Sequence, residues 1–396
     1  MFSGGVTKSY AELNYEFFKM INLNRKKRIL VLNYEFPPLG GGASPVSYEL
    51  AKKLSETDNF EIDVVTMSYN NLPKYEEINK NFRIFRVKSW RSKKELCHPW
   101  EQATYLVSGW FKCVKLIKNN QYDTCHCHFI IPTGVLALFL KKRFKLPYIV
   151  TSHGSDVLGY NARFKLLYPF LVGLWKRILD NAQKIITPSS FLKSEILKIH
   201  PKFGSNRIIV IPNGFDVDKF KPQKKEKYIF SSGRLLVNKG FQYLIQAVSE
   251  EDVGYEVHIA GDGPMMSELK ELSSKSKTKI IFHGWISNER KEYRDLLERS
   301  TVFILMSEAE SFGMSFIEAM CAGCVVITTN VSGCVETVGD AGLLVSPKNS
   351  VDLKSKIKNI LDKPKKIEEF KDRALNRAKR YDWAIVLEKY IEIIFT

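Results

Sequence analysis

The feature that most limits how this chain can fold is a repeated alternation of short apolar runs, turns and helices. Residues 302–306 form one such run, which is typical of a buried parallel strand. A turn of small residues follows, and a helix is expected to start near Ser315. Strands that alternate with helices in this way predict an α/β fold.

The same alternation recurs from residue 28 almost to the end of the chain. Further strands are predicted at residues 28–32, 62–67, 83–87, 147–152, 185–187, 207–211, 228–232, 255–260, 279–282, 324–328 and 343–345. A polar stretch, 215–227, interrupts the pattern and is interpreted as a connection between domains. The predicted organisation is an extension at 1–27, a domain at 28–215, a second domain at 216–380, and a helix at 381–396 that packs back on the first domain.

Length and composition narrow the class of protein. The 396 residues allow two domains of ordinary size. No stretch reaches the roughly 20 apolar residues that span a bilayer, and the N-terminus lacks the apolar core of a signal peptide. The seven cysteines lack paired spacing, which favours reduced thiols. We therefore expect a cytoplasmic protein.

The positive charge of the chain is concentrated in its first half. The formal net charge is +17, of which residues 1–215 carry +16 and residues 216–396 carry +1. This asymmetry favours an anionic partner, such as a membrane surface, a phosphorylated acceptor or nucleic acid. A lysine-rich composition without a partner is the alternative, although it should charge both halves alike.

Residues 90–118 combine aromatic and basic side chains. Trp90, Trp100, Trp110 and Phe111 lie among several lysines and Arg91. This mixture suits the surface of an anionic membrane. An ordinary covering helix with its aromatic residues in the core is slightly favoured over that interpretation.

The turn after residues 302–306 carries a candidate ligand site. Gly313 allows the backbone to approach a ligand closely, and the first free amides of the next helix, at Met314 and Ser315, could hold an anion. Glu310 and Glu318 could accept hydrogen bonds from hydroxyl groups. Such a site suits a ligand with both phosphate and hydroxyl groups. A solvated Glu310 and a Glu318 that pairs with the helix dipole are the alternative.

A second candidate element follows the strand at 228–232. Gly233 and Arg234 begin a turn that ends at Lys239, and two cations at the end of a strand could grip a diphosphate. A further glycine turn, which contains Gly263, follows the strand at 255–260.

The first half contains a glycine loop and a histidine at strand ends. Gly41 and Gly42 belong to a triple glycine between a strand and a helix, where an α/β fold approaches phosphate. The loop matches neither the dinucleotide fingerprint nor the Walker pattern, and a plain flexible turn is the alternative. His153, followed by Asp156, ends another strand and is expected to point into the ligand crevice.

Residues 125–128 read Cys-His-Cys-His, which raises the possibility of zinc. Strand alternation places Cys125 and Cys127 on one face and His126 and His128 on the other. A closed tetrahedral site would also need a distant second pair of ligands, and the sequence offers no such pair. Buried strand packing is therefore the favoured interpretation, and we expect no metal site.

Taken in order, these motifs resemble those of glycosyltransferase family 4, a group of retaining enzymes with the GT-B fold. The resemblance covers roughly residues 28–395 and includes the glycine loop, His153-Gly154-Ser155-Asp156, Pro212-Asn213-Gly214, Gly233-Arg234-Leu235, Lys239-Gly240, Gly261-Asp262-Gly263, His283-Gly284 and the Glu310/Glu318 pair. The Asp156 form of the histidine motif and the His126/His128 strand look like the subset that acts on bacterial surface polysaccharides, such as lipopolysaccharide and capsule.

The resemblance implies two Rossmann-like domains that face a central cleft, with the acceptor in the first and a UDP- or GDP-linked sugar in the second. It implies that Glu318 holds the ribose diol, that Arg234 and Lys239 hold the diphosphate, and that Glu310 and the amides of residues 313–315 position the sugar and phosphate. It further implies that His153 contacts the donor sugar, with Glu310 and His153 as the catalytic pair. The glycine loop would close over the phosphates or the acceptor entry, Asp156 would lie in the cleft, and no metal or other cofactor would be needed.

The expected activity is transfer of a hexosyl or N-acetylhexosaminyl group to a saccharide or polyprenyl-linked acceptor, on the inner face of the plasma membrane and without nucleic acid. Two other classes remain as alternatives. A nicotinamide-dependent oxidoreductase would need a dinucleotide fingerprint that is missing. A non-catalytic binder of anionic surfaces would not need Arg234, Lys239, Glu310 and Glu318 at strand ends.

Overall fold

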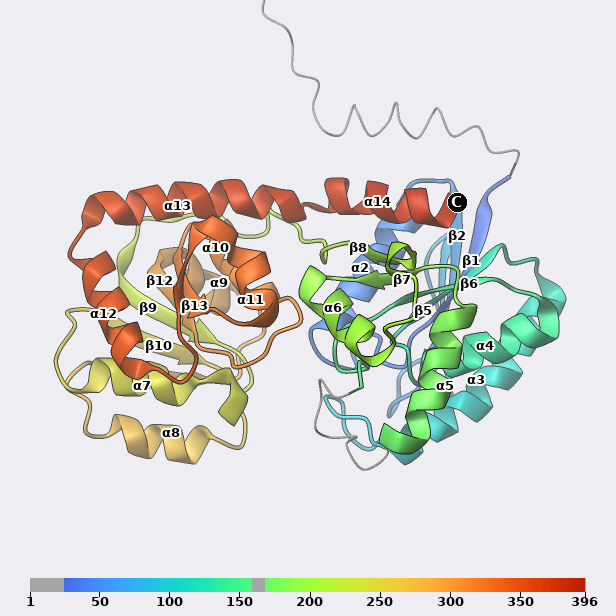
Figure 1. Cartoon of the computed structure of the whole chain (residues 1–396), viewed down its shortest axis with the longest axis horizontal. Coiled ribbons are helices and arrows are strands. Elements are labelled where there is room, and N and C mark those ends of the chain that lie inside the picture. Colours follow the sequence, from blue (N-terminus) through green and yellow to red (C-terminus); the bar gives the residue numbers. More distant parts are fainter. Residues whose placement is uncertain (1–24, 159–167, 396) are drawn as a thin grey trace, which may run out of the picture. The chain divides into compact units, whose positions relative to one another are not determined.

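The computed structural model describes residues 25–158 and 168–395 of the chain (Figure 1). The described chain divides into two compact units. The first unit contains the residues up to 188, residues 192–214 and residues 383–395, and the second contains residues 215–382 with 189–191. Most of the extension expected at 1–27 lies outside the described residues.

The first unit is built on an eight-stranded sheet. Its spatial order is β3 (Tyr75–Asn79), β4 (Phe82–Val87), β2 (Phe60–Met67), β1 (Lys27–Leu32), β5 (Thr124–His128), β6 (Tyr148–Thr151), β7 (Ile185–Thr187) and β8 (Ile208–Val210). All neighbouring strands are parallel except β3 and β4. Strand β3 was not predicted from the sequence, because this edge strand is largely exposed and has no apolar run.

Helices cover both faces of this sheet. They are α2 (Ala43–Glu56), α3 (Pro99–Asn119), α4 (Thr133–Phe144), α5 (Tyr168–Asn181), α6 (Ser190–Ile199) and α14 (Trp383–Phe395). In sequence and in space, α3 packs beside α4 and α4 beside α5, whereas α14 packs on α2 (Figure 1). The backbone carbonyl of Ile394 accepts a hydrogen bond from Lys27, and the rings of Phe60 and Phe395 are in contact. The C-terminal helix is therefore part of the first unit.

The second unit contains a six-stranded, fully parallel sheet. Its order is β11 (Ile280–Gly284), β10 (Glu256–Ala260), β9 (Glu226–Ser232), β12 (Ser300–Leu305), β13 (Val325–Thr329) and β14 (Gly342–Val345). Its helices are α7 (Phe241–Ser249), α8 (Met266–Ser273), α9 (Lys291–Arg299), α10 (Met314–Cys321), α11 (Ser332–Val338), α12 (Ser350–Leu361) and α13 (Pro364–Ala378).

Strands β12 and β13 form the centre of the core in this unit. Every residue of both strands is buried. They are nearly continuous apolar runs rather than alternating ones, because a parallel sheet with helices on both faces buries both sides of each strand. The expectation that residues 302–306 form a buried parallel strand is confirmed.

The strand orders locate a switch point in each sheet. In the second unit, chain progression runs outward from β9 in one direction through β10 and β11, and from β12 in the other through β13 and β14. In the first unit, the strands likewise run outward from β1 through β2 and β4 on one side, and from β5 through β6, β7 and β8 on the other. Ligands of such sheets bind beyond the carboxyl ends of the strands at this reversal. The loops after β9 and β12, and those after β1 and β5, therefore define where a site can lie.

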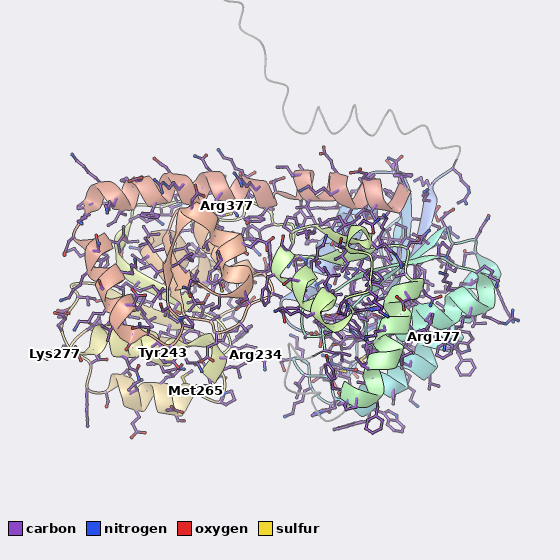
Figure 2. All side chains as sticks on the ribbon, viewed as in Figure 1. Arg177, Arg234, Tyr243, Met265, Lys277 and Arg377 are labelled. Carbon is purple, nitrogen blue, oxygen red and sulfur yellow. The ribbon has the colours of Figure 1, made fainter. Side chains whose placement is uncertain are left out.

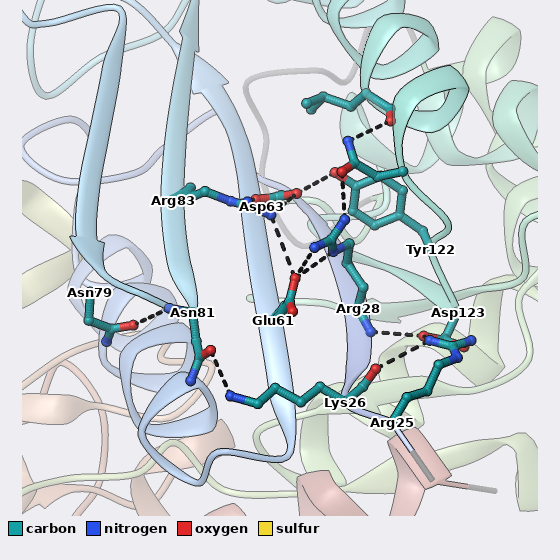
Figure 3. Close-up of polar contacts among 12 residues, drawn as sticks. Arg25, Lys26, Arg28, Glu61, Asp63, Asn79, Asn81, Arg83, Tyr122 and Asp123 are labelled. Carbon is teal, nitrogen blue, oxygen red and sulfur yellow. Dashed lines mark hydrogen bonds and ion pairs between the residues drawn. The ribbon is translucent and has the colours of Figure 1, made fainter. Parts of the chain in front are cut away.

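The opposite edge of the first sheet is held by a polar cluster (Figure 3). Buried Asp63 accepts two hydrogen bonds from Arg83, at 2.6 and 2.9 Å, and another from Tyr122. Arg28 pairs with Glu61 on the adjacent strand. These contacts tie β1, β2 and β4 together at their amino ends, away from the loops that follow the strands.

The aromatic and basic segment 90–118 differs in part from both interpretations drawn from the sequence. Trp90, Trp100 and Phe111 are exposed, so the interpretation that places the aromatic residues in the core is wrong for all three. Trp110 alone of the four packs against the core. Arg91 is buried and donates to the backbone carbonyls of residues 34, 93 and 94, which removes it from any outer surface.

Candidate active site

In the second unit, the loops after β9, β10 and β12 are bonded directly to one another. Leu235 N donates to Asp262 O at 2.9 Å, and Glu308 N donates to Asn238 O at 2.8 Å. Gly240 adopts a positive φ of 72°, and a Cβ atom at this position would lie 2.2 Å from the backbone oxygen of Met306. Glycine is required here because the two loops pass closer than a side chain allows.

Two candidate residues from different loops form an ion pair in this arrangement. Lys239, at the end of the turn after β9, contacts the carboxylate of Glu310, which lies after β12. Ser307 donates a second hydrogen bond to Glu310 Oε1 at 3.0 Å. The backbone of Glu310 is held as well, because its N–H donates to Ser332 Oγ at 3.0 Å and its carbonyl accepts from Gly333 N at 2.9 Å. Glu310 is therefore fixed in position, which corrects the alternative of a free, solvated side chain.

Arg234 lies in the same turn but has a different environment. Its side chain is exposed (Figure 2), and its guanidinium group forms no hydrogen bond or ion pair with the described parts of the chain. The five N–H donors of arginine match the oxygens of a phosphate. The loop after β9 thus presents one cation held by a carboxylate and another cation open to solvent.

Helix α10 begins at this edge of the sheet. Gly313 precedes it with a φ of 91°, and a Cβ there would lie 2.4 Å from the ring of Phe316. Over the described residues, the backbone N–H groups of Met314 and Ser315 have no recorded acceptor, as expected for the first turn of a helix. These amides can accept an anion, with the positive end of the helix dipole behind them.

Glu318, one turn into α10, is buried with only 6% of its surface exposed. Its two oxygens accept hydrogen bonds from Asn288 Nδ2 at 2.9 Å and from Tyr293 Oη at 2.8 Å. Burial raises the pKa of Glu318, while these two donors act in the opposite direction. Each carboxylate oxygen has a further lone-pair site, so Glu318 can still accept bonds from a diol.

The residues that hold these two carboxylates were not found by the sequence analysis. Tyr293 and Asn288 position Glu318, and Ser307 and Ser332 position Glu310. Tyr293 is on α9 and bridges Glu318 to Ser232 at the end of β9. Nothing in its sequence context marks it, because contacts between distant elements leave no local pattern.

In the first unit, His153 belongs to a row of histidines on adjacent strands. His128 Nδ1 and His153 Nε2 are 3.1 Å apart, and their rings stack. His126 bonds Thr151 Oγ1 at 2.8 Å and lies against His128. Burial lowers the pKa of His153 to about 4 and that of His126 to about 3, so both are neutral at pH 7.

Asp156 is an anchor for the loop that carries His153. Its carboxylate accepts from the backbone N–H groups of Ile130 at 2.7 Å and of His153 and Gly154 at 3.0 Å each. Burial raises the pKa of Asp156, and these donors oppose that rise. Asp156 was expected to lie in the acceptor site or cleft, whereas its oxygens bond backbone N–H groups of the protein.

Phe129, between His128 and the Asp156-bound amide of Ile130, has a φ of 77°. A bulky residue in this left-handed region is strained, and such residues cluster at functional sites. The Phe129 ring packs against His153 at 4.8 Å between centroids. The end of β5 is thus held in an unusual conformation beside the candidate catalytic histidine.

The glycine loop after β1 is held at Asn33 and at Gly40 but is open at its last two residues, Gly41 and Gly42. Asn33 Nδ2 donates to Ser47 Oγ on α2 at 2.7 Å, and Gly40 N donates to Lys94 O at 3.0 Å. By contrast, Cβ atoms built on Gly41 and Gly42 would meet no atom within 4 Å. These two glycines therefore leave open space next to the N-terminus of α2.

The two sheets, parallel except for the pair β3 and β4, and their strand-end loops define the GT-B class of glycosyltransferase. Two family descriptions match consecutive parts of the chain: "Glycosyltransferase Family 4" over residues 40–219 and "Glycosyl transferases group 1" over residues 214–377. The chain belongs to glycosyltransferase family 4.

Known proteins agree with this assignment. The uncharacterized glycosyltransferase MJ1607 of Methanocaldococcus jannaschii is 27% identical over 329 residues, which cover 77% of this chain and 80% of the relative. The UDP-Gal:alpha-D-GlcNAc-diphosphoundecaprenol alpha-1,3-galactosyltransferase of Escherichia coli is 26% identical over 332 residues, with 77% and 80% covered. The solved structure of sucrose-phosphate synthase from Thermosynechococcus elongatus has a TM-score of 0.79 at 19% identity, with 93% and 98% covered.

Proposed function

We propose that this glycosyltransferase moves a hexosyl or N-acetylhexosaminyl group from a UDP- or GDP-linked sugar to a saccharide or polyprenyl-linked acceptor, with retention of configuration, in the synthesis of a bacterial surface polysaccharide. The observation that carries the proposal is the convergence of Arg234, Lys239, Glu310 and the first amides of α10 at one switch point. Cations, free amides and a hydroxyl acceptor together match a nucleoside diphosphate sugar.

The proposed roles of these residues follow from their charges and hydrogen-bonding groups. Cleavage of the sugar–phosphate bond leaves negative charge on the diphosphate, which Arg234, Lys239 and the amides of Met314 and Ser315 would stabilise electrostatically. Glu318 would accept the two ribose hydroxyls. Glu310, held rigidly by Ser307 and Lys239, would bind a hydroxyl group of the donor sugar. The rigidity matters because a transition state is stabilised best by groups that need no reorganisation.

His153 would act on the donor sugar as a neutral hydrogen-bonding group. Its pKa of about 4 keeps an imidazole, rather than an imidazolium, at neutral pH. The bond between His128 and His153 fixes the ring and selects its tautomer. Asp156 would serve as a positioning residue, because its backbone contacts set the loop on which His153 sits.

Retention and independence of metal ions are part of the proposal. Among the described residues, no second carboxylate beside Glu310 is an obvious nucleophile. Glu318 is turned toward Tyr293 and Asn288, which donate hydrogen bonds to it. The acceptor would then attack from the face that the diphosphate leaves, with a diphosphate oxygen taking the acceptor proton. Two protein cations at the diphosphate site supply the charge that a metal ion would otherwise provide.

The acceptor is proposed from relatives and from charge. The Escherichia coli relative carries UDP-Gal and a diphosphoundecaprenol-linked acceptor in its name, which supports a UDP-sugar donor and a lipid-linked acceptor here. No helix in the described parts of the chain is long and apolar enough to cross a membrane. The excess positive charge of residues 1–215 supports a peripheral location at the inner face of the plasma membrane, with an anionic lipid surface and no nucleic acid as the partner.

The test is a transfer assay with purified protein, UDP- and GDP-sugars, and saccharide or polyprenyl-diphosphate-linked acceptors. A thermal-shift screen selects the donor first, because a ligand that binds the folded state raises the melting temperature. The expected product, detected by mass spectrometry, keeps the anomeric configuration of the donor in NMR spectra and forms in excess chelator. Absence of nucleotide binding would overturn the proposal, an inverted product would overturn retention, and activity restored only by magnesium or manganese would overturn metal independence.

A further inference from the structure

Helix α3 has a single exposed stripe whose composition is unusual. Its exposed side chains follow one another at intervals of three or four residues: Trp100, Ala103, Val107, Phe111, Lys115 and Lys118. Such intervals place side chains on one face of a helix. The outward face is therefore apolar over the first three turns and basic over the last two. A helix that covers a sheet normally turns its polar side chains outward.

The neighbouring helices α4 and α5 repeat this pattern. On α4, exposed Phe139 is followed by exposed Lys142 and Arg143. On α5, exposed Phe170 is followed by exposed Arg177. Phe170 is 83% exposed and Phe111 69%, values far above those of ordinary core-facing aromatic residues. Each helix thus presents an aromatic residue and then one or two cations.

Acidic side chains are nearly absent from these three helices. Glu101, the one acid of α3, is fully buried and accepts bonds from Ser92 and the N–H of His98. Helix α4 has none, and Asp180 of α5 bonds His200. The nearest exposed acid before α3, Glu95, follows Lys93 and Lys94. Apart from Asp180, the exposed face of these three helices is therefore apolar and cationic, with no further exposed acidic side chain on α3, α4 or α5.

We propose that this surface, made by the exposed residues of α3, α4 and α5 together with Trp90, docks on an anionic lipid bilayer. Trp90 N donates to Thr104 Oγ1 at 3.2 Å, which holds the Trp90 loop against α3. Aromatic residues with cations behind them suit the boundary between lipid headgroups and acyl chains. A protein partner of the usual kind would be expected to meet a mixed polar rim, whereas this surface repeats one pattern on three helices.

The position of the surface fits a lipid-linked acceptor, and to that extent the inference rests on the proposed function. Trp100 and Phe170 lie in the first turns of α3 and α5. The loop before α3 is bonded to the glycine loop, because Gly40 N donates to Lys94 O. Helix α4 begins next to the end of β5, where Thr133 Oγ1 donates to the backbone carbonyl of His128. Trp100 and Phe170 therefore lie toward the edge of the sheet that carries the glycine loop and His153, whereas Phe111 and Phe139 lie further along their helices.

The experiment is co-sedimentation of the full-length protein with vesicles of phosphatidylglycerol and phosphatidylcholine, or of phosphatidylcholine alone, at 0.1 M and 1 M salt. Two variants test the two components of the surface: Phe111→Gln with Phe170→Gln, and Lys115→Gln with Lys118→Gln and Lys142→Gln. A control variant changes matched residues in the second unit, namely Val351→Gln with Lys365→Gln and Lys366→Gln, all of which are exposed.

The protein and the control variant are expected to bind the anionic vesicles at low salt and to be released at high salt, because the Debye length falls from roughly 10 Å to 3 Å. The triple lysine variant should lose about 100-fold in partition coefficient, since each basic residue near an anionic surface contributes about a factor of five. The aromatic variant should lose at least about tenfold. Equal binding to neutral vesicles, or equal losses in the control variant, would overturn the inference.

Two further measurements separate this inference from its rivals. Light scattering without lipid reports whether the surface joins two copies of the chain, and a dimer that the Phe111/Phe170 variant dissolves would overturn membrane docking. Calorimetric affinity for the nucleotide should be unchanged in both surface variants. Loss of vesicle binding with normal nucleotide binding supports docking, whereas failure of the proposed function would appear as absent nucleotide binding in a protein that still sediments with vesicles.

Discussion

At the scale of single residues, the two carboxylates of the second unit differ in their surroundings. Glu310 is paired with a lysine and held by two serines, whereas Glu318 is buried between an amide and a phenol. The contacts of Glu310 hold its carboxylate in place in a strand-end loop. The contacts of Glu318 fix the direction of its buried carboxylate. These differences match the roles proposed above, in which Glu310 binds the donor sugar and Glu318 binds the ribose.

Replacement of the two cations by alanine should weaken nucleotide binding. Arg234→Ala and Lys239→Ala each remove a charged contact to the proposed diphosphate, worth about 1.5–3 kcal/mol, which is roughly 10- to 150-fold in affinity. Isothermal titration calorimetry with the preferred nucleoside diphosphate measures the change. Lys348→Ala, which removes the partner of Glu308 nearby, is the control. Unchanged affinity in both site variants would contradict the assignment of the diphosphate site.

Removal of the Tyr293 hydroxyl group should weaken nucleotide binding, although Tyr293 lies on α9 and not in a strand-end loop. Tyr293→Phe removes a hydrogen bond to the charged form of Glu318, so the pKa of Glu318 should rise further. Nucleotide affinity should fall by about 1 kcal/mol, and the loss should grow as the pH is lowered toward the pKa of Glu318. Calorimetry between pH 5.5 and 8 checks this, with Tyr255→Phe as the control. A loss that does not vary with pH would mean that Tyr293 acts only through packing.

At the scale of elements, the site depends on how closely the strand-end loops approach one another. The loops after β9, β10 and β12 are joined by backbone hydrogen bonds, and glycines occupy the points of closest approach. Lys239 and Glu310 meet because the loops that carry them are held together in this way. A backbone change outside the candidate ligand contacts should therefore affect nucleotide binding.

Gly240→Ala tests this directly. The left-handed conformation costs a non-glycine residue about 1–2 kcal/mol, and the added Cβ would also collide with the Met306 carbonyl. Gly254→Ala is a matched control, because Gly254 has a φ of 71° but open space around it. Urea denaturation should show destabilisation in both variants, larger in Gly240→Ala. Only Gly240→Ala should also lose nucleotide affinity, and equal affinity in the two variants would refute the proposed coupling between the loops.

At the scale of the whole molecule, the buried histidines make stability depend on pH. The folded-state pKa of His126 is about 3 and that of His153 about 4, both below the unfolded value of 6.5. The unfolded state therefore binds more protons below pH 6.5. The contribution of each histidine to stability is complete above that pH and is lost as the pH falls toward the folded-state value.

At pH 5 each of these histidines should cost about 2 kcal/mol of unfolding free energy relative to pH 7.5. Urea denaturation at the two pH values measures the loss, and His126→Gln should reduce it. His200→Gln, at a histidine that bonds Asp180 at the surface, is the control and should leave the loss unchanged. The raised pKa values of Glu318 and Asp156 act in the opposite direction, so the comparison between variants is the deciding quantity. An equal loss in both variants would contradict the prediction.

Much of the architecture could be predicted from the sequence, for a physical reason. A parallel strand covered on both faces must be apolar throughout, so β12 and β13 are visible as runs of apolar residues. The glycines and cations after these strands are visible because a ligand approached by backbone needs small residues and charge close together in sequence. The edge strand β3 escaped detection because an exposed strand needs no apolar run.

What the tertiary structure alone decided are the contacts between residues far apart in the chain. It joined Lys239 to Glu310, turned Glu318 toward Tyr293, aimed Asp156 at the backbone that carries His153, and left Phe111 and Phe170 outside the core. Local sequence determines which segments form strands and helices, because backbone conformation and burial follow from residues a few positions apart. Side-chain partners depend on which elements the fold brings together, and only the packed chain determines that.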